Sequence, residues 1–75
     1  MLYSVIATKK ELKRVEKKVD SEGLPITEVR SISRLELVQL GAKPGAFRKL
    51  FWVIFEATEE QYKTLVRKLD LKEVF

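Results

Sequence analysis

The sequence contains no cysteine and no histidine, and these absences exclude several kinds of site. Without cysteine, the chain forms no disulfide and has no thiolate for catalysis or for binding a soft metal. Without histidine, it lacks the commonest zinc ligand and the side chain that most often acts as a base near neutral pH. We therefore expect no metal site, no cofactor and no catalytic residues. Because the acidic side chains fall mainly on expected exposed helix faces, the chain is not expected to be an enzyme.

The sequence also lacks a long apolar run. No stretch approaches the roughly 20 residues that cross a bilayer, and the first residues lack the basic start and apolar middle of a signal peptide. A cytoplasmic location without membrane insertion is therefore expected. The 15 basic and 11 acidic residues leave a formal net charge of +4, an excess too small to make nucleic-acid binding the leading hypothesis.

What the chain does contain is enough apolar material for one small domain. It has 75 residues, of which 45% are hydrophobic, so residues 1–75 are expected to form a single domain. Domains of this size bury a thin core and commonly gain stability from disulfides, metals or association between subunits. With the first two excluded by composition, we expect a homo-oligomer.

Apolar periodicity and turn residues predict six elements in the order strand, helix, strand, strand, helix, strand. A capping-box pattern at Thr8 and Glu11 marks the start of the first helix, and Gly23 marks its end. A second such pattern, at Thr58 and Gln61, starts the second helix. The expected strands are residues 2–7, 26–40, 49–57 and 71–75, the first helix is residues 9–21, and a turn covers residues 41–45.

This order predicts an α+β, ferredoxin-like βαββαβ fold, in which two helices cover one face of an antiparallel sheet. The strand at residues 49–57 is apolar on both sides, because Phe51, Val53 and Phe55 alternate with three further large side chains. Those three are Leu50, Trp52 and Ile54. Since two helices cover only one sheet face, we expect these three residues to form an oligomer interface on the other face.

The segment Gly-Leu-Pro-Ile-Thr-Glu-Val-Arg at residues 23–30, followed by Ser-Ile-Ser-Arg, resembles the PII (nitrogen regulatory) signal-transduction family. Thr27, Glu28 and Val29 match the family pattern directly, and Arg34 falls where the family has a phosphate-contacting arginine. The resemblance implies a trimer packed through its sheets, with nucleotide bound in clefts between subunits and a protein partner under regulation. The chain is a short, divergent member by this pattern, because no glycine-rich phosphate loop follows the second helix.

The resemblance and the basic side chains together suggest a ligand-binding site at Thr27, Arg30, Arg34 and Lys49. With Arg30 and Arg34 on one strand face and Lys49 on the neighbouring strand, the site would clamp a small anionic ligand, such as a nucleotide. The alternative is that the arginines form ion pairs with Glu28, Glu36 or Glu56 across the sheet.

An RNA-binding or other nucleic-acid-binding module of the same fold is the alternative function. The first helix carries two basic rows at i, i+4 spacing, which are Lys9, Lys13 and Lys17, and Lys10, Arg14 and Lys18. Glu11 and Glu16 interrupt these rows in the sequence, and a solvated helix face would explain them equally. The aromatic residues Phe47, Phe51, Trp52 and Phe55 would either stack bases or pack in a core or interface.

Overall fold

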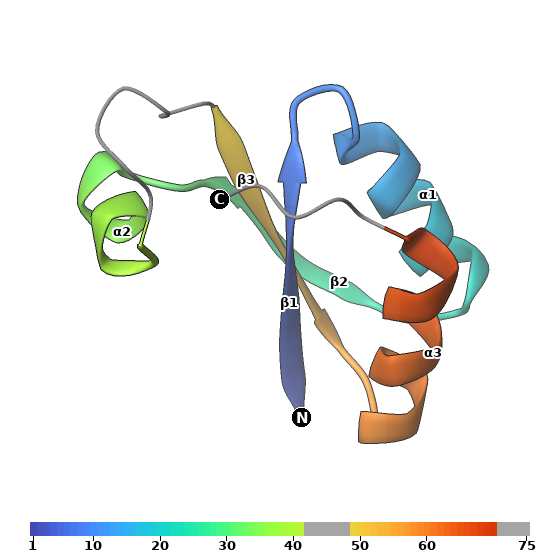
Figure 1. Ribbon diagram of the computed structural model, residues 1–75. Coiled ribbons are helices and arrows are strands. Elements are labelled where there is room, and N and C mark those ends of the chain that lie inside the picture. The colour runs from blue at the N-terminus through green and yellow to red at the C-terminus, as the bar shows by residue number, and fades with distance from the viewer. Residues whose placement is uncertain (42–48, 71–75) are drawn as a thin grey trace.

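The computed structural model describes residues 1–41 and 49–70 and shows an α+β domain built on a three-stranded antiparallel sheet (Figure 1). The elements in chain order are β1 (Leu2–Thr8), α1 (Leu12–Ser21), β2 (Ile26–Ser31), α2 (Arg34–Gln39), β3 (Leu50–Glu56) and α3 (Glu59–Leu69). The α+β class expected from the sequence is therefore confirmed. The expected strand at residues 71–75 lies outside the described residues. Residues 42–45 of the expected turn lie outside them as well.

Strand β3 lies in the middle of the sheet and runs antiparallel to both of its neighbours. Its Val53 is opposite Val5 of β1 on one side and opposite Val29 of β2 on the other. The two outer strands therefore run in the same direction and are joined by α1, with the later strand inserted between them. A bulge between Ile26 and Glu28 shifts the pairing at the start of β2.

Local signals set both ends of α1. Thr8 and Glu11 exchange hydrogen bonds as the capping-box pattern predicts, with Glu11 N donating to Thr8 Oγ1 at 3.3 Å and Thr8 N donating to Glu11 Oε1 at 3.2 Å. These bonds close a turn, and the helix begins after it rather than at residue 9. Gly23 follows the helix with φ of 74°, which lets Leu24 N donate to Val19 O at 3.2 Å.

The expected strand at residues 26–40 is wrong in its second half, because β2 ends at Ser31 and the chain then forms α2. Ser33 caps this helix: its hydroxyl accepts a hydrogen bond from Glu36 N at 3.2 Å, and its own N–H donates to Glu36 Oε1 at 3.2 Å. This reciprocal cap satisfies N–H groups that a helix start otherwise leaves unpaired. It outweighs the alternation of apolar residues that suggested a strand.

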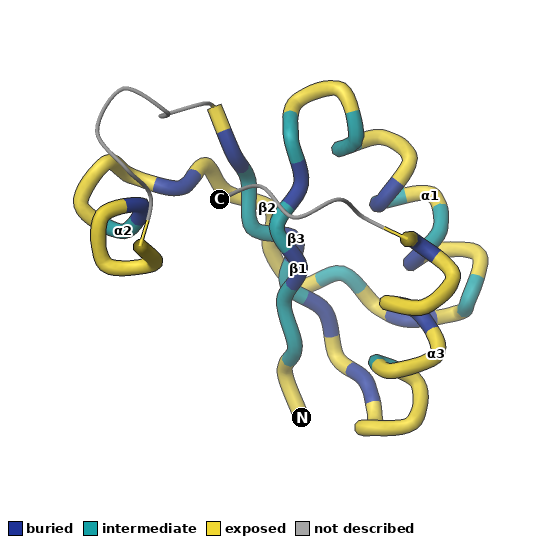
Figure 2. Tube along the Cα trace, viewed as in Figure 1, coloured by how far each residue is buried: buried dark blue, intermediate teal, exposed yellow. Residues whose placement is uncertain are grey.

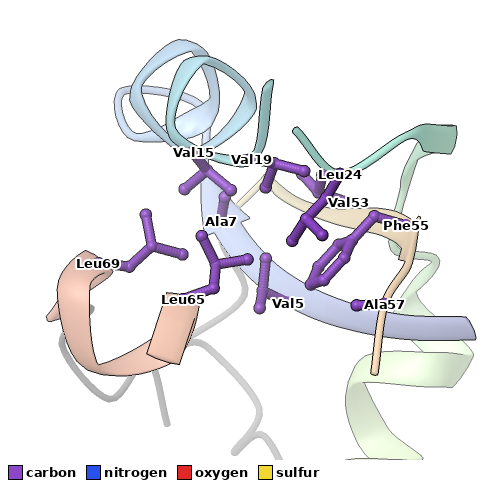
Figure 3. Close-up of a cluster of buried hydrophobic side chains, with 10 residues drawn as sticks. All are labelled: Val5, Ala7, Val15, Val19, Leu24, Val53, Phe55, Ala57, Leu65 and Leu69. Carbon is purple, nitrogen blue, oxygen red and sulfur yellow. The ribbon is translucent and has the colours of Figure 1, made fainter. Parts of the chain in front are cut away.

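The main core lies between the sheet and the two longer helices (Figure 3). Its buried members come from β1, α1, β3, α3 and the connections between elements: Val5, Ala7, Val15, Val19, Leu24, Val53, Phe55, Ala57, Leu65 and Leu69. Tyr3 and Tyr62 stack at its border with ring centroids 4.4 Å apart. Helices α1 and α3 therefore cover one face of the sheet, as expected.

A second, smaller cluster lies on the opposite face. It consists of Ile32, Leu37 and Leu50, with Ile6 and Trp52 packed against it. Figures 1 and 2 show α2 on the side of the sheet away from α1 and α3. The prediction that β3 is apolar on both faces is confirmed, and its second face is partly covered by a helix of the same chain. Within residues 1–41 and 49–70, no helix is long and apolar enough to cross a membrane.

Candidate functional site

The expected anion site begins at the outer edge of the sheet, on β2. Thr27 lies beside the bulge, and its hydroxyl donates to Ile54 O at 3.2 Å. Arg30 is opposite Trp52 of β3, further along the same strand. Because side chains alternate along a strand, Arg30 and Glu28 share the sheet face that carries Ile54 and Trp52.

Arg30 is held by two carboxylates. Its Nη1 and Nη2 donate to the two carboxylate oxygens of Glu36 at 3.0 and 3.1 Å, and its Nε lies 3.9 Å from Glu28 Oε1. The Arg30 hydrogen bonds, together with those from Ser33, lower the pKa of Glu36 to about 2. The Glu36 hydrogen bonds likewise raise the pKa of Arg30. The alternative prediction, that Arg30 forms ion pairs with acidic residues of the same chain, is therefore confirmed. Its main partner is Glu36, which lies on α2 and not on another strand.

Arg34 does not share a strand face with Arg30, because it is the first residue of α2. Lys49 lies immediately before β3 and is exposed, as is Arg34. Ile32 N donates to Leu50 O at 2.8 Å. If this antiparallel pairing is continued by one residue, Lys49 lies beside Ser33, which precedes Arg34. The structure thus brings three of the expected cations to one end of the β2–β3 pair and leaves Thr27 toward the other end.

The expected oligomer interface is more covered than the sequence suggested. Leu50 is 2% exposed within the single chain, because Ile32 and Leu37 pack against it. Trp52 is partly exposed, and its Nε1 is buried without a hydrogen-bond partner in the described part of the chain. Ile54 is partly exposed beyond the reach of this cluster. A partner would therefore meet Ile54 and the edge of Trp52, and would not meet Leu50.

The open part of this face is mixed in character. Opposite Ile54 lie Ser4 on β1 and Glu28 on β2, and Leu2 at the start of β1 is 58% exposed. Phe55 is fully buried on the other face, so it is not available to stack a nucleic-acid base. Phe47 lies outside the described residues.

A hollow on the other side of the molecule was not expected from the sequence. It has a volume of about 400 Å³, lies between α1 and the end of α3, and is lined by Arg14, Lys17, Lys18, Ser21, Lys68 and Leu69. The basic rows of α1 were visible in the sequence, but Lys68 was not linked to them. No local pattern gives that link, because it depends on the packing of α1 against α3.

The remaining pKa shifts come from exposed ion pairs rather than from an enclosed cleft. A hydrogen bond from Lys68 is the main cause that lowers the pKa of Glu22. In the described residues, no group of three acidic side chains is arranged to hold a metal ion. The chain matches no protein-family model, no curated protein and no solved structure.

Proposed function

We propose that this chain is a small PII-like regulatory module that associates through the open part of its sheet face and binds a small anion beside Arg34 and Lys49. The proposal includes the complete ferredoxin-like βαββαβ order, whose last strand, expected at residues 71–75, lies outside the described residues. It also includes a trimeric assembly and a protein partner that responds to the bound anion.

The observation that carries the proposal is the uneven covering of the sheet. Within residues 1–41 and 49–70, one face is covered by α1 and α3, while the other is covered only at the Leu50 end by the short helix α2. Ile54 is left partly exposed on that second face, close to the exposed Leu2. Burying such side chains against a second chain is favourable by roughly 25 cal/mol per Å² of apolar surface. Association through this face therefore adds to the thin core of a small domain.

The anion site follows from the geometry of the cations. Arg30 is already engaged by both carboxylate oxygens of Glu36 and lies 3.9 Å from Glu28, so the anion site is assigned to the two other cations. Arg34 and Lys49 lie exposed at the same end of the β2–β3 pair. A phosphate-sized anion bound there would meet Arg34 and Lys49.

Native mass spectrometry tests the assembly. We expect a trimer, and we expect Ile54→Lys to shift the protein to the monomer by placing a charge in the buried interface. Val66→Lys is the matched control, because Val66 is also apolar, is 42% exposed and lies on α3. A wild-type monomer at every concentration would refute association, as would an unchanged trimer for the folded Ile54→Lys variant.

A ligand panel tests the anion site in the same instrument. ATP, ADP, AMP, cyclic nucleotides and acidic amino acids are the probes, and at least one is expected to remain bound to the wild-type protein. Arg34→Ala should abolish this binding, whereas Arg67→Ala, at an exposed arginine on the last turn of α3, should not. Equal binding by both variants would show that the site lies elsewhere.

A further inference from the structure

The outward side of α1 carries a continuous basic surface. Lys13, Arg14, Lys17 and Lys18 occupy two adjacent i, i+4 rows. With about 3.6 residues per turn, Lys13 and Lys17 lie opposite the buried Val15 and Val19, and Arg14 and Lys18 lie on the flank toward α3. We call these four residues, together with Lys68 of α3, the α1 basic face. Lys68 joins it because the two helices pack side by side and both line the hollow of about 400 Å³.

The acidic residues of α1 border this face and do not interrupt it. Glu11 lies at the start of the helix, where it is hydrogen-bonded to Thr8 and 3.9 Å from Arg14. Glu16 and Asp20 line a second hollow on the side of α1 toward β2, together with Ile26 and with Lys13 and Lys17 at the edge of the basic face. The sequence suggested that Glu11 and Glu16 break the basic rows, and the folded helix instead places them at its borders.

Two of the five cations are fixed in position. Arg14 Nη1 donates to Leu69 O at 2.9 Å, and Lys68 is paired with Glu22. Lys13, Lys17 and Lys18 have no ion pair within 4.0 Å in the part of the chain that the structure describes. The face therefore combines two positioned cations with three lysines outside ion-pair distance, of which Lys18 lies close enough to Glu22 to help lower its pKa. Its five positive charges exceed the charge of the two paired carboxylates, Glu11 and Glu22.

The chemistry of this face fits a polyphosphate chain better than a lipid surface. Helices that bind in the membrane interface insert an apolar side, but Val15 and Val19, the apolar side of α1, are fully buried under the sheet. Successive turns of α1 present cations about 5.4 Å apart along the helix, so a chain with regularly repeated charges can contact several of them. The face offers one hydroxyl, Ser21, and no aromatic side chain, so it has little with which to distinguish bases.

We propose that the α1 basic face binds the sugar–phosphate backbone of nucleic acid without reading its sequence. This site is separate from the anion site at Arg34 and lies on the opposite side of the sheet from the proposed oligomer interface. Its ligand is a polyanion, and its affinity comes from releasing the counterions that surround the phosphates.

Fluorescence anisotropy with a labelled DNA duplex, repeated over a range of salt, tests the proposal. If all five cations contact phosphates, the slope of log K against log salt is about −4.5, which weakens binding about 500-fold from about 50 to about 200 mM salt. Lys17→Ala and Lys18→Ala should each reduce the slope by about 0.9, so that the same rise in salt weakens binding about 150-fold. A mixed-sequence RNA strand should bind with a shallower slope, about −0.7 per contact.

The matched control is Lys63→Ala, because Lys63 is an exposed lysine on α3 that is ion-paired with Glu59 at 3.3 Å. It should leave both affinity and slope unchanged. The proposal is wrong if the wild-type protein does not bind at low salt, if Lys17→Ala and Lys63→Ala give the same slope, or if anionic vesicles are bound and nucleic acid is not. Loss of duplex binding in Arg34→Ala alone would also overturn it, by moving the contact to the other site.

The proposed regulatory function is tested separately. Lys17→Ala and Lys18→Ala should keep the oligomeric state and the small-anion binding of the wild-type protein. If no trimer is found, or if no small anion binds beside Arg34, the measured binding of the DNA duplex still tests the α1 basic face.

Discussion

At the scale of single residues, Glu36 connects more of the structure than any sequence pattern suggested. Its carboxylate binds Arg30 through both oxygens and also accepts from the backbone N–H of Ser33. One side chain therefore caps α2 and fixes a cation of β2. The sequence could have predicted the cap, because Ser33 and Glu36 have the capping-box spacing. It could not predict the pairing with Arg30, which requires the chain to turn after Ser31.

The lowered pKa of Glu36 makes its contribution to stability depend on pH. Because its pKa falls from 4.5 to about 2 on folding, the carboxylate stabilises the fold above about pH 4.5, and this contribution is lost as the pH falls toward about 2. Glu36→Gln keeps an oxygen for the Ser33 N–H and removes the charge. The variant should unfold at lower urea concentration than wild type near neutral pH, and the difference should close at about pH 2.

Urea midpoints measured across that pH range check this prediction. Glu16→Gln is the control, because no ion pair of Glu16 is found in the described residues. The control and wild type should show the same pH dependence in this range. A Glu36→Gln difference that stays constant down to about pH 2 would contradict the assigned role of the charge.

At the scale of elements, α2 shows where alternation misled the sequence analysis. As a strand, Val29, Ser31, Ser33, Leu35 and Leu37 would share one face, and the other face would carry Arg30, Arg34 and Glu36 with one apolar exception, Ile32. The residues after the Ser33 cap also fit a helix, because Leu37 packs against Ile32 and Leu50 while Leu35 is 68% exposed. Over so few residues, the spacing of apolar side chains does not distinguish a strand from a short helix. The capping box at Ser33 and Glu36 favours the helix.

Leu37→Ala should release α2 while the rest of the fold persists. The substitution removes the main contact of α2 with the second cluster, at a cost of about 2–5 kcal/mol for a buried leucine. Amide hydrogen exchange should become faster in α2 and stay slow in α1 and α3. Trp52 emission should shift to longer wavelength, because this residue packs against the same cluster.

Leu35→Ala is the control for α2, since its side chain is 68% exposed and should leave exchange unchanged. If Leu37→Ala instead makes exchange faster in all the helices equally, then α2 is part of a single cooperative unit with the main core.

At the scale of the whole molecule, the sheet divides the apolar residues into a large cluster under α1 and α3 and a small one under α2. The sequence predicted from β3 alone that both sheet faces carry apolar residues, because Val53 and Phe55 alternate with Leu50 and Trp52, but it assigned the second face to an oligomer interface. It did not predict that Arg30 pairs with Glu36 or that Lys68 lies beside the cations of α1. That depends on the turn after Ser31 and on the packing of α1 against α3, neither of which a local pattern records.

Leu65→Ala should destabilise the whole domain, in contrast to the local effect of Leu37→Ala. Leu65 is fully buried in the large cluster, and its truncation should lower the free energy of unfolding by about 2–5 kcal/mol. Circular dichroism and Trp52 fluorescence should report the same lowered urea midpoint. Val66→Ala, at a neighbouring residue that is 42% exposed, should change the midpoint little. Different midpoints from the two probes for Leu65→Ala would show that the clusters unfold independently.

The insertion of β3 between β1 and β2 also sets when the sheet can form during synthesis. A growing chain releases β1 first and β2 next, yet neither strand has its partner until residues 50–56 emerge. Helices α1 and α2, by contrast, precede β3 in the chain and begin at a turn or cap formed by residues close in sequence, so they can form before β3 is synthesised. On the ribosome, the nascent protein would therefore carry helices before it has a sheet, and its two outer strands would depend on the rate at which translation reaches β3.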